Sequence, residues 1–134
     1  MGMFNATTLR QANAQNRITA AGANARWDAY NGAKPINGGA VTGANTLLAR
    51  LISPTVIGTA TNGVTDIDEA GITQTVGSHV NGTATFLDLT TSAGVLVSRF
   101  DVGAGAGNVQ LSGPIVTGQL VTFVPGATIT EGNL

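Results

Sequence analysis

The stretch GTATFLDLTTSAGVLVSRFDVG, residues 82–103, decides the fold. Apolar and polar residues alternate on both sides of Ser92, Ala93 and Gly94, which predicts two strands, residues 83–91 and 95–102, joined by a three-residue loop. Gly94 suits the last position of the loop because glycine adopts a positive φ without steric cost. The stretch is therefore predicted to be a β-hairpin.

The register that we expect for this hairpin pairs Thr91 with Val95, and it places Phe86 opposite Phe100. Two aromatic rings in direct contact would contribute about 0.5 to 1 kcal/mol beyond burial. The opposite face is only partly apolar, since it carries Arg99 among other polar residues. The predicted core face of the hairpin consists of Phe86, Leu96, Phe100 and Val102.

Short runs rich in Thr, Val and Ile, separated by Gly-rich turns, continue on both sides of the hairpin. Residues 46–52 fit a strand or a helix, and Pro54 shortly after them favours a strand. Asn62 and Gly63 form a strong hairpin-turn signal. The other predicted strands are residues 25–30, 55–61, 64–67, 71–76, 108–111 and 119–124, and residues 127–130 are a candidate closing strand. Roughly seven to nine short strands predict a mainly β fold, an antiparallel β-sandwich or a jelly roll.

Residues 6–24 are rich in Ala and Gln and predict a helix, with Asn5 as its N-cap. The apolar stripe is weak, and the helix needs something to pack against. Two interpretations stay open: a helix on the surface of its own domain, and an arm that becomes ordered on assembly. The domain organisation that we expect is a helix or arm, residues 1–24, followed by one β-sandwich domain, residues 25–134.

Charge and composition exclude several classes of function. The net charge of -1 comes from scattered charged residues, so we expect no binding to nucleic acid. The chain has no Cys, which excludes disulfides, thiol catalysis and thiolate metal sites. No apolar run approaches the ~20 residues that span a bilayer, and MGMFNATTLR lacks the features of a secretory signal, so no membrane partner is expected.

Candidate chemistry is sparse. His79 is the single histidine, and in the loop VGSHVNG it predicts a solvated polar residue rather than a general base. The segment DIDEAG, residues 66–71, has clustered carboxylates but lacks the remaining ligands of a calcium loop, which favours a solvated acidic turn. Asp88 and Asp101 have no carboxylate neighbour in the sequence. We therefore expect a protein that is not an enzyme and uses no catalytic residue, metal or cofactor.

Several motifs follow one another in a recognisable order. After the Ala-rich helix come WDAYNGAKP at residues 27–35, LLARL at 47–51, the GTATF hairpin with its Ser-Ala-Gly turn, GAGAG at 103–107, and a Val-x-Phe segment followed by Ile-Thr-Glu-Gly at 129–132. This order resembles a group of small structural proteins of tailed bacteriophages. The resemblance implies a virion component, of the head decoration or cement type.

The resemblance also implies partners and a location. The partners would be the major capsid protein and other copies of the chain, as a dimer or trimer, on the capsid surface of a virion whose proteins are synthesised in the host cytoplasm. Two alternatives stay open, a head-tail or tail component and a carbohydrate-binding or enzymatic sandwich. The contact residues that we expect lie in the amino-terminal segment, the Gly-rich loop 36–45 and the carboxyl-terminal tail: Leu9, Arg10, Arg17, Ile36, Val41 and Ile129.

Overall fold

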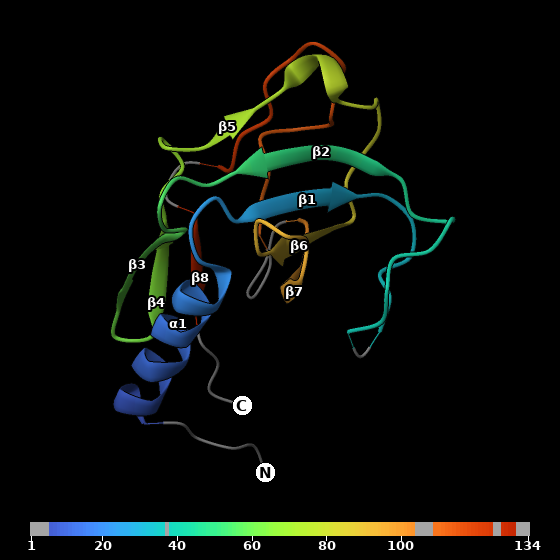
Figure 1. Ribbon diagram of the computed structural model, residues 1–134. Coiled ribbons are helices and arrows are strands. Elements are labelled where there is room, and N and C mark those ends of the chain that lie inside the picture. Colours follow the sequence, from blue (N-terminus) through green and yellow to red (C-terminus); the bar gives the residue numbers. More distant parts are fainter. Residues whose placement is uncertain (1–5, 37, 104–108, 125–126, 131–134) are drawn as a thin grey trace.

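Two antiparallel sheets and one helix make up the computed structural model, which describes residues 6–36, 38–103, 109–124 and 127–130 (Figure 1). The helix is α1 (Thr7–Ala21). The larger sheet has the order β5 (Thr73–Gln74), β2 (Leu47–Ile52), β1 (Arg26–Tyr30), β6 (Phe86–Thr90) and β7 (Leu96–Asp101). The smaller sheet has the order β3 (Gly58–Thr61), β4 (Val64–Ile67) and β8 (Thr128–Thr130). A short 3-10 turn, η1 (Val76–Ser78), follows β5.

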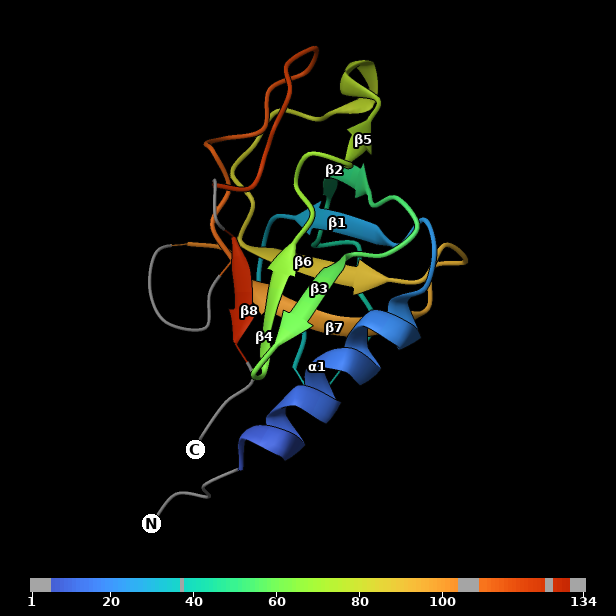
Figure 2. The same cartoon turned by 90° about the vertical axis from the view of Figure 1, so that its left-hand side faces the viewer.

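The two sheets form an open, sandwich-like arrangement. The strands of the smaller sheet run across those of the larger sheet, and α1 lies along the β3–β4 hairpin (Figure 2). The core lies between the sheets, where the larger sheet contributes Leu51, Leu87 and Leu89 and the smaller sheet contributes Ile67 and Ile129. The predicted mainly β, antiparallel sandwich-like fold is therefore confirmed, although the sheets do not close around the core.

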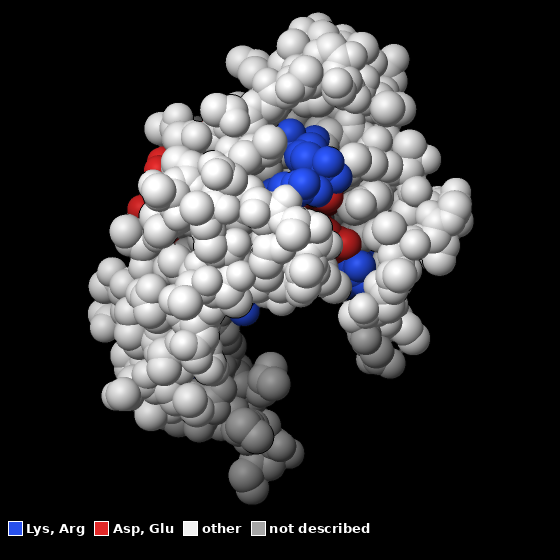
Figure 3. Space-filling model, in the orientation of Figure 1, with Lys and Arg blue, Asp and Glu red and all other residues white. Residues whose placement is uncertain are grey.

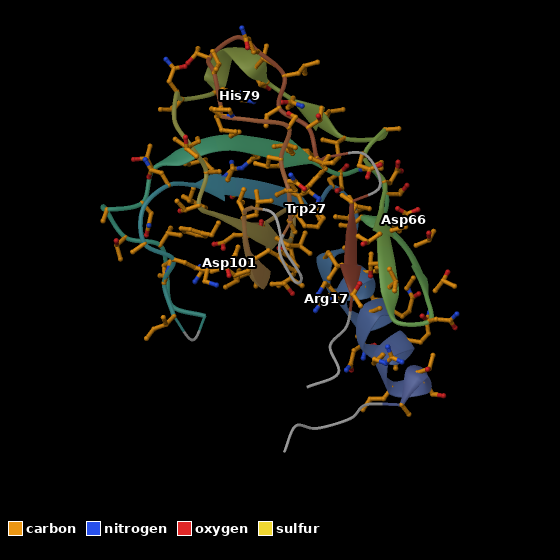
Figure 4. All side chains as sticks on the ribbon, turned by 180° about the vertical axis from the view of Figure 1, so that it is seen from behind. Arg17, Trp27, Asp66, His79 and Asp101 are labelled. Atoms are coloured by element: carbon orange, nitrogen blue, oxygen red, sulfur yellow. The ribbon has the colours of Figure 1, made fainter. Side chains whose placement is uncertain are left out.

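Trp27 occupies the centre of this core between the two sheets (Figure 4). Its ring packs edge-on against Phe123 at 5.2 Å between centroids and lies 6.1 Å from Phe100. Its indole Nε1 donates a hydrogen bond of 2.8 Å to the hydroxyl of Ser53. A buried indole normally needs such a partner, so the core holds the large ring without leaving a polar group unpaired.

The predicted hairpin forms, but its predicted register is wrong. The turn has the expected geometry, with Gly94 at φ 88° and the Thr91 amide donating to the Val95 carbonyl. A bulge between Leu89 and Thr90 then shifts the register by one residue, so that Phe86 faces Asp101 and not Phe100. A shift of one residue moves a side chain to the other face of a sheet.

The shifted register separates the two phenylalanines. Phe100 now faces Leu87 and packs against the core, together with Val102, while Leu96 is half-buried. Phe86 lies on the outer face of the larger sheet, where it stacks on Tyr30 at 5.3 Å between ring centroids. The physical reason is the space beside Trp27, which Phe100 fills once the bulge turns it inward.

Several predicted strands are shorter in the structure than their sequence patterns. The run 55–61 forms a strand only from Gly58, and 71–76 forms only the two residues of β5. Segments 108–111 and 119–124 form isolated bridges, Val102 with Val109 and Leu111 with Phe123, and Asn108 lies outside the described residues. Side chains replace the missing ladder bonds, as where the Gln74 amide bonds both the carbonyl and the N–H of Val121.

The helix packs against its own chain. Ala14, Ile18 and Ala21 are its buried residues, and its contacts go to β3, β4 and β7. The Gln11 side chain donates to the Ala60 carbonyl and accepts from the Gly63 amide, so it binds the β3–β4 hairpin as a strand would. The predicted N-cap, Asn5, lies outside the described residues, and Ala6 holds the cap position without a side-chain bond.

Candidate interaction surface

A row of four charged side chains crosses the outer face of the larger sheet. The strand register places Arg50 of β2 beside Asp28 of β1, Asp28 beside Asp88 of β6, and Asp88 beside Arg99 of β7. In Figure 3 the blue and red atoms gather over the middle of this sheet. We call these four residues the charged row. Its two carboxylates are neighbours, and each has a guanidinium on its other side.

Each arginine holds its carboxylate with two hydrogen bonds. Arg99 donates to Asp88 at 2.6 and 2.8 Å, and Arg50 donates to Asp28 at 2.7 and 3.1 Å. The Arg99 side chain is 9% exposed and the Arg50 side chain 39% exposed, so the first pair is the more enclosed. These hydrogen bonds raise the pKa of both arginines above its usual value.

Arg99 also anchors the Gly-rich loop. Its Nη1 donates to the carbonyls of Pro35 and Gly39, and its guanidinium lies 5.4 Å from the centre of the Phe86 ring. Tyr30 stacks on the same ring, and burial raises the pKa of its hydroxyl, with Asp28 and Asp88 raising it further. One arginine thus connects the sheet, the stacked rings and the loop.

The charged row links neighbouring strands of the larger sheet through ion pairs. Two adjacent carboxylates suggest general acid and base catalysis, but here both oxygens of each accept from arginine. Both aspartates are buried, at 4% and 5% exposed, and the four charges sum to zero. Sequence reasoning missed the Asp28–Asp88 neighbourhood because the two residues lie far apart in the chain. The row pairs β2, β1, β6 and β7 in one register, because any slip would leave a buried charge unpaired.

The surface around η1 lacks the charged side chains of the row. We define the uncharged lobe as residues 71–82 and 109–124, which hold β5, η1 and the segment before β8. Apart from His79, residues 71–87 and 102–130 contain no ionisable side chain. The lobe lies at the top of Figure 1, and the same region is white in Figure 3.

Three apolar side chains of the lobe are exposed to solvent. Leu120 is 70% exposed, Val80 44% and Val116 39%. They flank His79, whose ring Nδ1 lies 3.0 Å from the Gln119 carbonyl and whose own carbonyl accepts from the Thr117 hydroxyl. Hydrogen bonds of His79 therefore join the two segments of the lobe that carry these exposed apolar side chains.

His79 itself corrects the sequence interpretation. It was expected to be solvated, but it is 4% exposed in the structure, because the segment 117–119 covers it. Figure 4 shows it at the top of the molecule, away from Asp66 and Asp101, which lie lower on opposite sides. The structure therefore brings none of the predicted chemical residues together with it.

The predicted contact residues have different environments. Leu9 and Ile36 are exposed, at 49% and 78%, while Arg10 and Val41 are half-buried. Arg17 bonds the Ser98 hydroxyl and lies over the Phe100 ring, so it fastens α1 to β7. Ile129 belongs to the core, because β8 turns this side chain toward the larger sheet. The availability of Ile129 for a partner was therefore predicted wrongly.

The acidic turn is occupied by contacts within the chain. Asp68 accepts a hydrogen bond from the Gly71 amide, and Glu69 accepts one from the Ala127 amide. Within the described ranges, no three His, Cys, Asp or Glu side chains come close enough to form a metal cluster. Among the same residues, no helix has the length and hydrophobicity needed to span a bilayer.

Comparison with known proteins finds no relative: no family model, no curated protein and no solved structure matches this chain. The resemblance to virion proteins of tailed phages therefore depends on the order of sequence motifs. The surface described above is independent of that resemblance.

Proposed function

We propose that this protein is a structural subunit of a tailed-phage virion, which binds the outside of the major capsid protein shell and stabilises it. The uncharged lobe carries the proposal. Interface cores are depleted of charged residues, and exposed apolar side chains grouped on one region mark interaction sites. Leu120, Val80 and Val116 form such a group around His79. The motif order supplies the partner, since it resembles phage decoration proteins.

The proposed mechanism is physical. A subunit that binds the assembled shell, and not the free capsid protein, stabilises the shell by mass action. An interface of about 1,600 Å² in total is ordinary for a stable complex, and contact with several capsid subunits raises the overall affinity. Association with further copies of the chain, as a dimer or trimer at a symmetry axis, fits the same mechanism.

Purified protein and capsids of the phage that encodes it would test the proposal. We expect the protein to cosediment with mature capsids and to raise their melting temperature. Leu120→Asp should reduce the affinity at least about tenfold, because it buries a charge in the interface. Val95→Asp is the matched control, since Val95 is 63% exposed at the hairpin turn, outside the lobe.

Three results would contradict this proposal or its contact surface. Wild-type protein that neither binds capsids nor changes their melting temperature would remove the shell as partner. A few copies per virion in quantitative gels would instead indicate a head-tail or tail component. Equal effects of Leu120→Asp and Val95→Asp would remove the lobe as the contact surface.

A further inference from the structure

The connection between α1 and β1 is short and has an unusual backbone conformation. It consists of residues 22–25, where Gly22 ends the helix at φ 70° and Asn24 has φ 55°. In the part of the chain that the structure describes, Asn24 and Asn62 are the two non-glycine residues with positive φ. This conformation costs free energy for a residue with a Cβ, although Asn tolerates it better than most. Short connections under strain favour domain swapping, in which copies of a chain exchange one element.

The helix at this connection buries little apolar surface. Its buried residues are Ala14, Ile18 and Ala21, and Ala6 at its N-cap provides no side-chain hydrogen bond. Figure 2 shows α1 along the outer side of the β3–β4 hairpin, with its first turn beyond the tip of the hairpin. An element with few buried apolar contacts separates from the rest of a protein at a low free-energy cost.

The surface that α1 covers is matched to this helix. Gln11 donates to the Ala60 carbonyl and accepts from the Gly63 amide, and Arg17 donates to the Ser98 hydroxyl. A helix that makes all of these contacts needs the same residues at the same spacing. The α1 of a second copy meets this requirement, because its sequence is identical. The contacts within one chain therefore identify the segment that can replace its helix.

We propose that two copies of this protein associate by exchanging α1. The α1–β1 connection extends, and the helix of each copy binds β3, β4 and β7 of the other through the contacts described above. Extension releases Asn24 from its positive φ, and water replaces the hydrogen bond from its N–H to the Pro54 carbonyl, because Asn24 is exposed. Reciprocal exchange gives a closed, symmetric dimer. This inference rests on the proposed function for the role of the dimer on the capsid, but it is tested on the purified protein.

Substitutions at the two asparagines with positive φ separate exchange from general destabilisation. Asn24→Val should raise the dimer association constant at least about tenfold in sedimentation velocity over a concentration series, because a β-branched residue strongly disfavours positive φ. Asn24→Gly removes the steric cost and should lower the constant. Asn62→Val is the matched control. Its turn belongs to the β3–β4 hairpin, which α1 binds in both states, so it should lower the unfolding temperature and leave the association constant unchanged.

Isotope-filtered NMR on a mixture of labelled and unlabelled copies tests the exchange directly. In the dimer we expect contacts between the Gln11 side-chain amide of one copy and Ala60 or Gly63 of the other. Three results would overturn the exchange: these contacts only within one copy, a parent and an Asn24→Val variant that stay monomeric at every concentration, or equal effects of Asn24→Val and Asn62→Val on association.

The exchange and the proposed function can fail separately. Capsid binding by a protein that does not exchange α1 would overturn the exchange and leave the proposed function standing. Interchain contacts of Gln11 in a protein that does not bind capsids would overturn the proposed function and support the exchange.

Discussion

The charged row lies on the larger sheet and the uncharged lobe joins that sheet through β5, but the two regions are held by different interactions. The row uses guanidinium–carboxylate pairs whose aspartates are buried. The lobe uses neutral amide, hydroxyl and imidazole groups, and it leaves Leu120, Val80 and Val116 exposed. The difference teaches that the charges of the row serve contacts within the chain, where they fix the register of the strands. The outside of the lobe is left without charge, which favours association with another surface.

The largest effect should come from breaking the charged row. Asp88→Ala leaves Arg99 enclosed without its carboxylate, and the loss of one partner of a buried pair costs about 3–5 kcal/mol. Chemical denaturation would measure the free energy of unfolding. Asp101→Ala is the control, because its contact with Lys34 is exposed and should contribute less than about 0.5 kcal/mol. Equal losses in the two variants would contradict the structural role of the row.

Removing a hydrogen bond between uncharged groups should lower the stability of the uncharged lobe. Gln74→Met leaves the carbonyl and N–H of Val121 without partners, which should cost about 1–3 kcal/mol. Gln15→Met, on the exposed side of α1, keeps a similar helix propensity and should cost little. Hydrogen exchange would localise the effect to residues 117–123. A loss that spreads evenly over β1 and β6 would show that the lobe is not a separate unit.

The free energy of unfolding should depend on alkaline pH through Tyr30, which lies on the same face as the charged row. The pKa of Tyr30 is raised in the folded state, so its contribution to stability is complete below the ordinary value of about 10 and is lost as the pH rises through the folded value. Because the chain has one tyrosine, phenolate absorbance follows this group directly. Tyr30→Phe should reduce the alkaline loss of stability. A phenolate that forms at the ordinary pKa would show that the stacked rings are open to water.

The smallest effect on stability should come from the exposed apolar groups. Leu120→Ser should change the free energy of unfolding by less than about 0.5 kcal/mol, because Leu120 is mostly exposed. The same substitution should still weaken capsid binding, since the group would be buried in the complex. A large loss of stability without loss of binding would mean that Leu120 supports the fold and not the interface.

The sequence could predict the elements but not all of their relations. The Ser-Ala-Gly loop, the Asn-Gly turn and the alternation of residues 25–30 are local signals, and each of these elements forms as predicted. The bulge that separates Phe86 from Phe100 depends on the space beside Trp27, which comes from distant segments. The charged row could not be predicted from the sequence for the same reason. Its four residues come together only through the pairing of four strands that lie far apart in the chain.

The lobe shows a second limit of sequence patterns. Residues 119–124 alternate as a strand would, and Val121 and Phe123 are indeed buried while Leu120 is exposed. Yet only one bridge forms there, because the Gln74 amide takes the bonds of Val121. A side chain that replaces a strand has no periodic signature, and neither does a histidine buried by a neighbouring turn.

Density for this chain in an intact phage particle tests the central claim most directly. We expect many copies on the outside of the capsid, with residues 71–82 and 109–124 against the major capsid protein and the charged row outside that contact. A subunit that turns Leu120, Val80 and Val116 toward solvent, or that lies on the tail alone, would contradict the account.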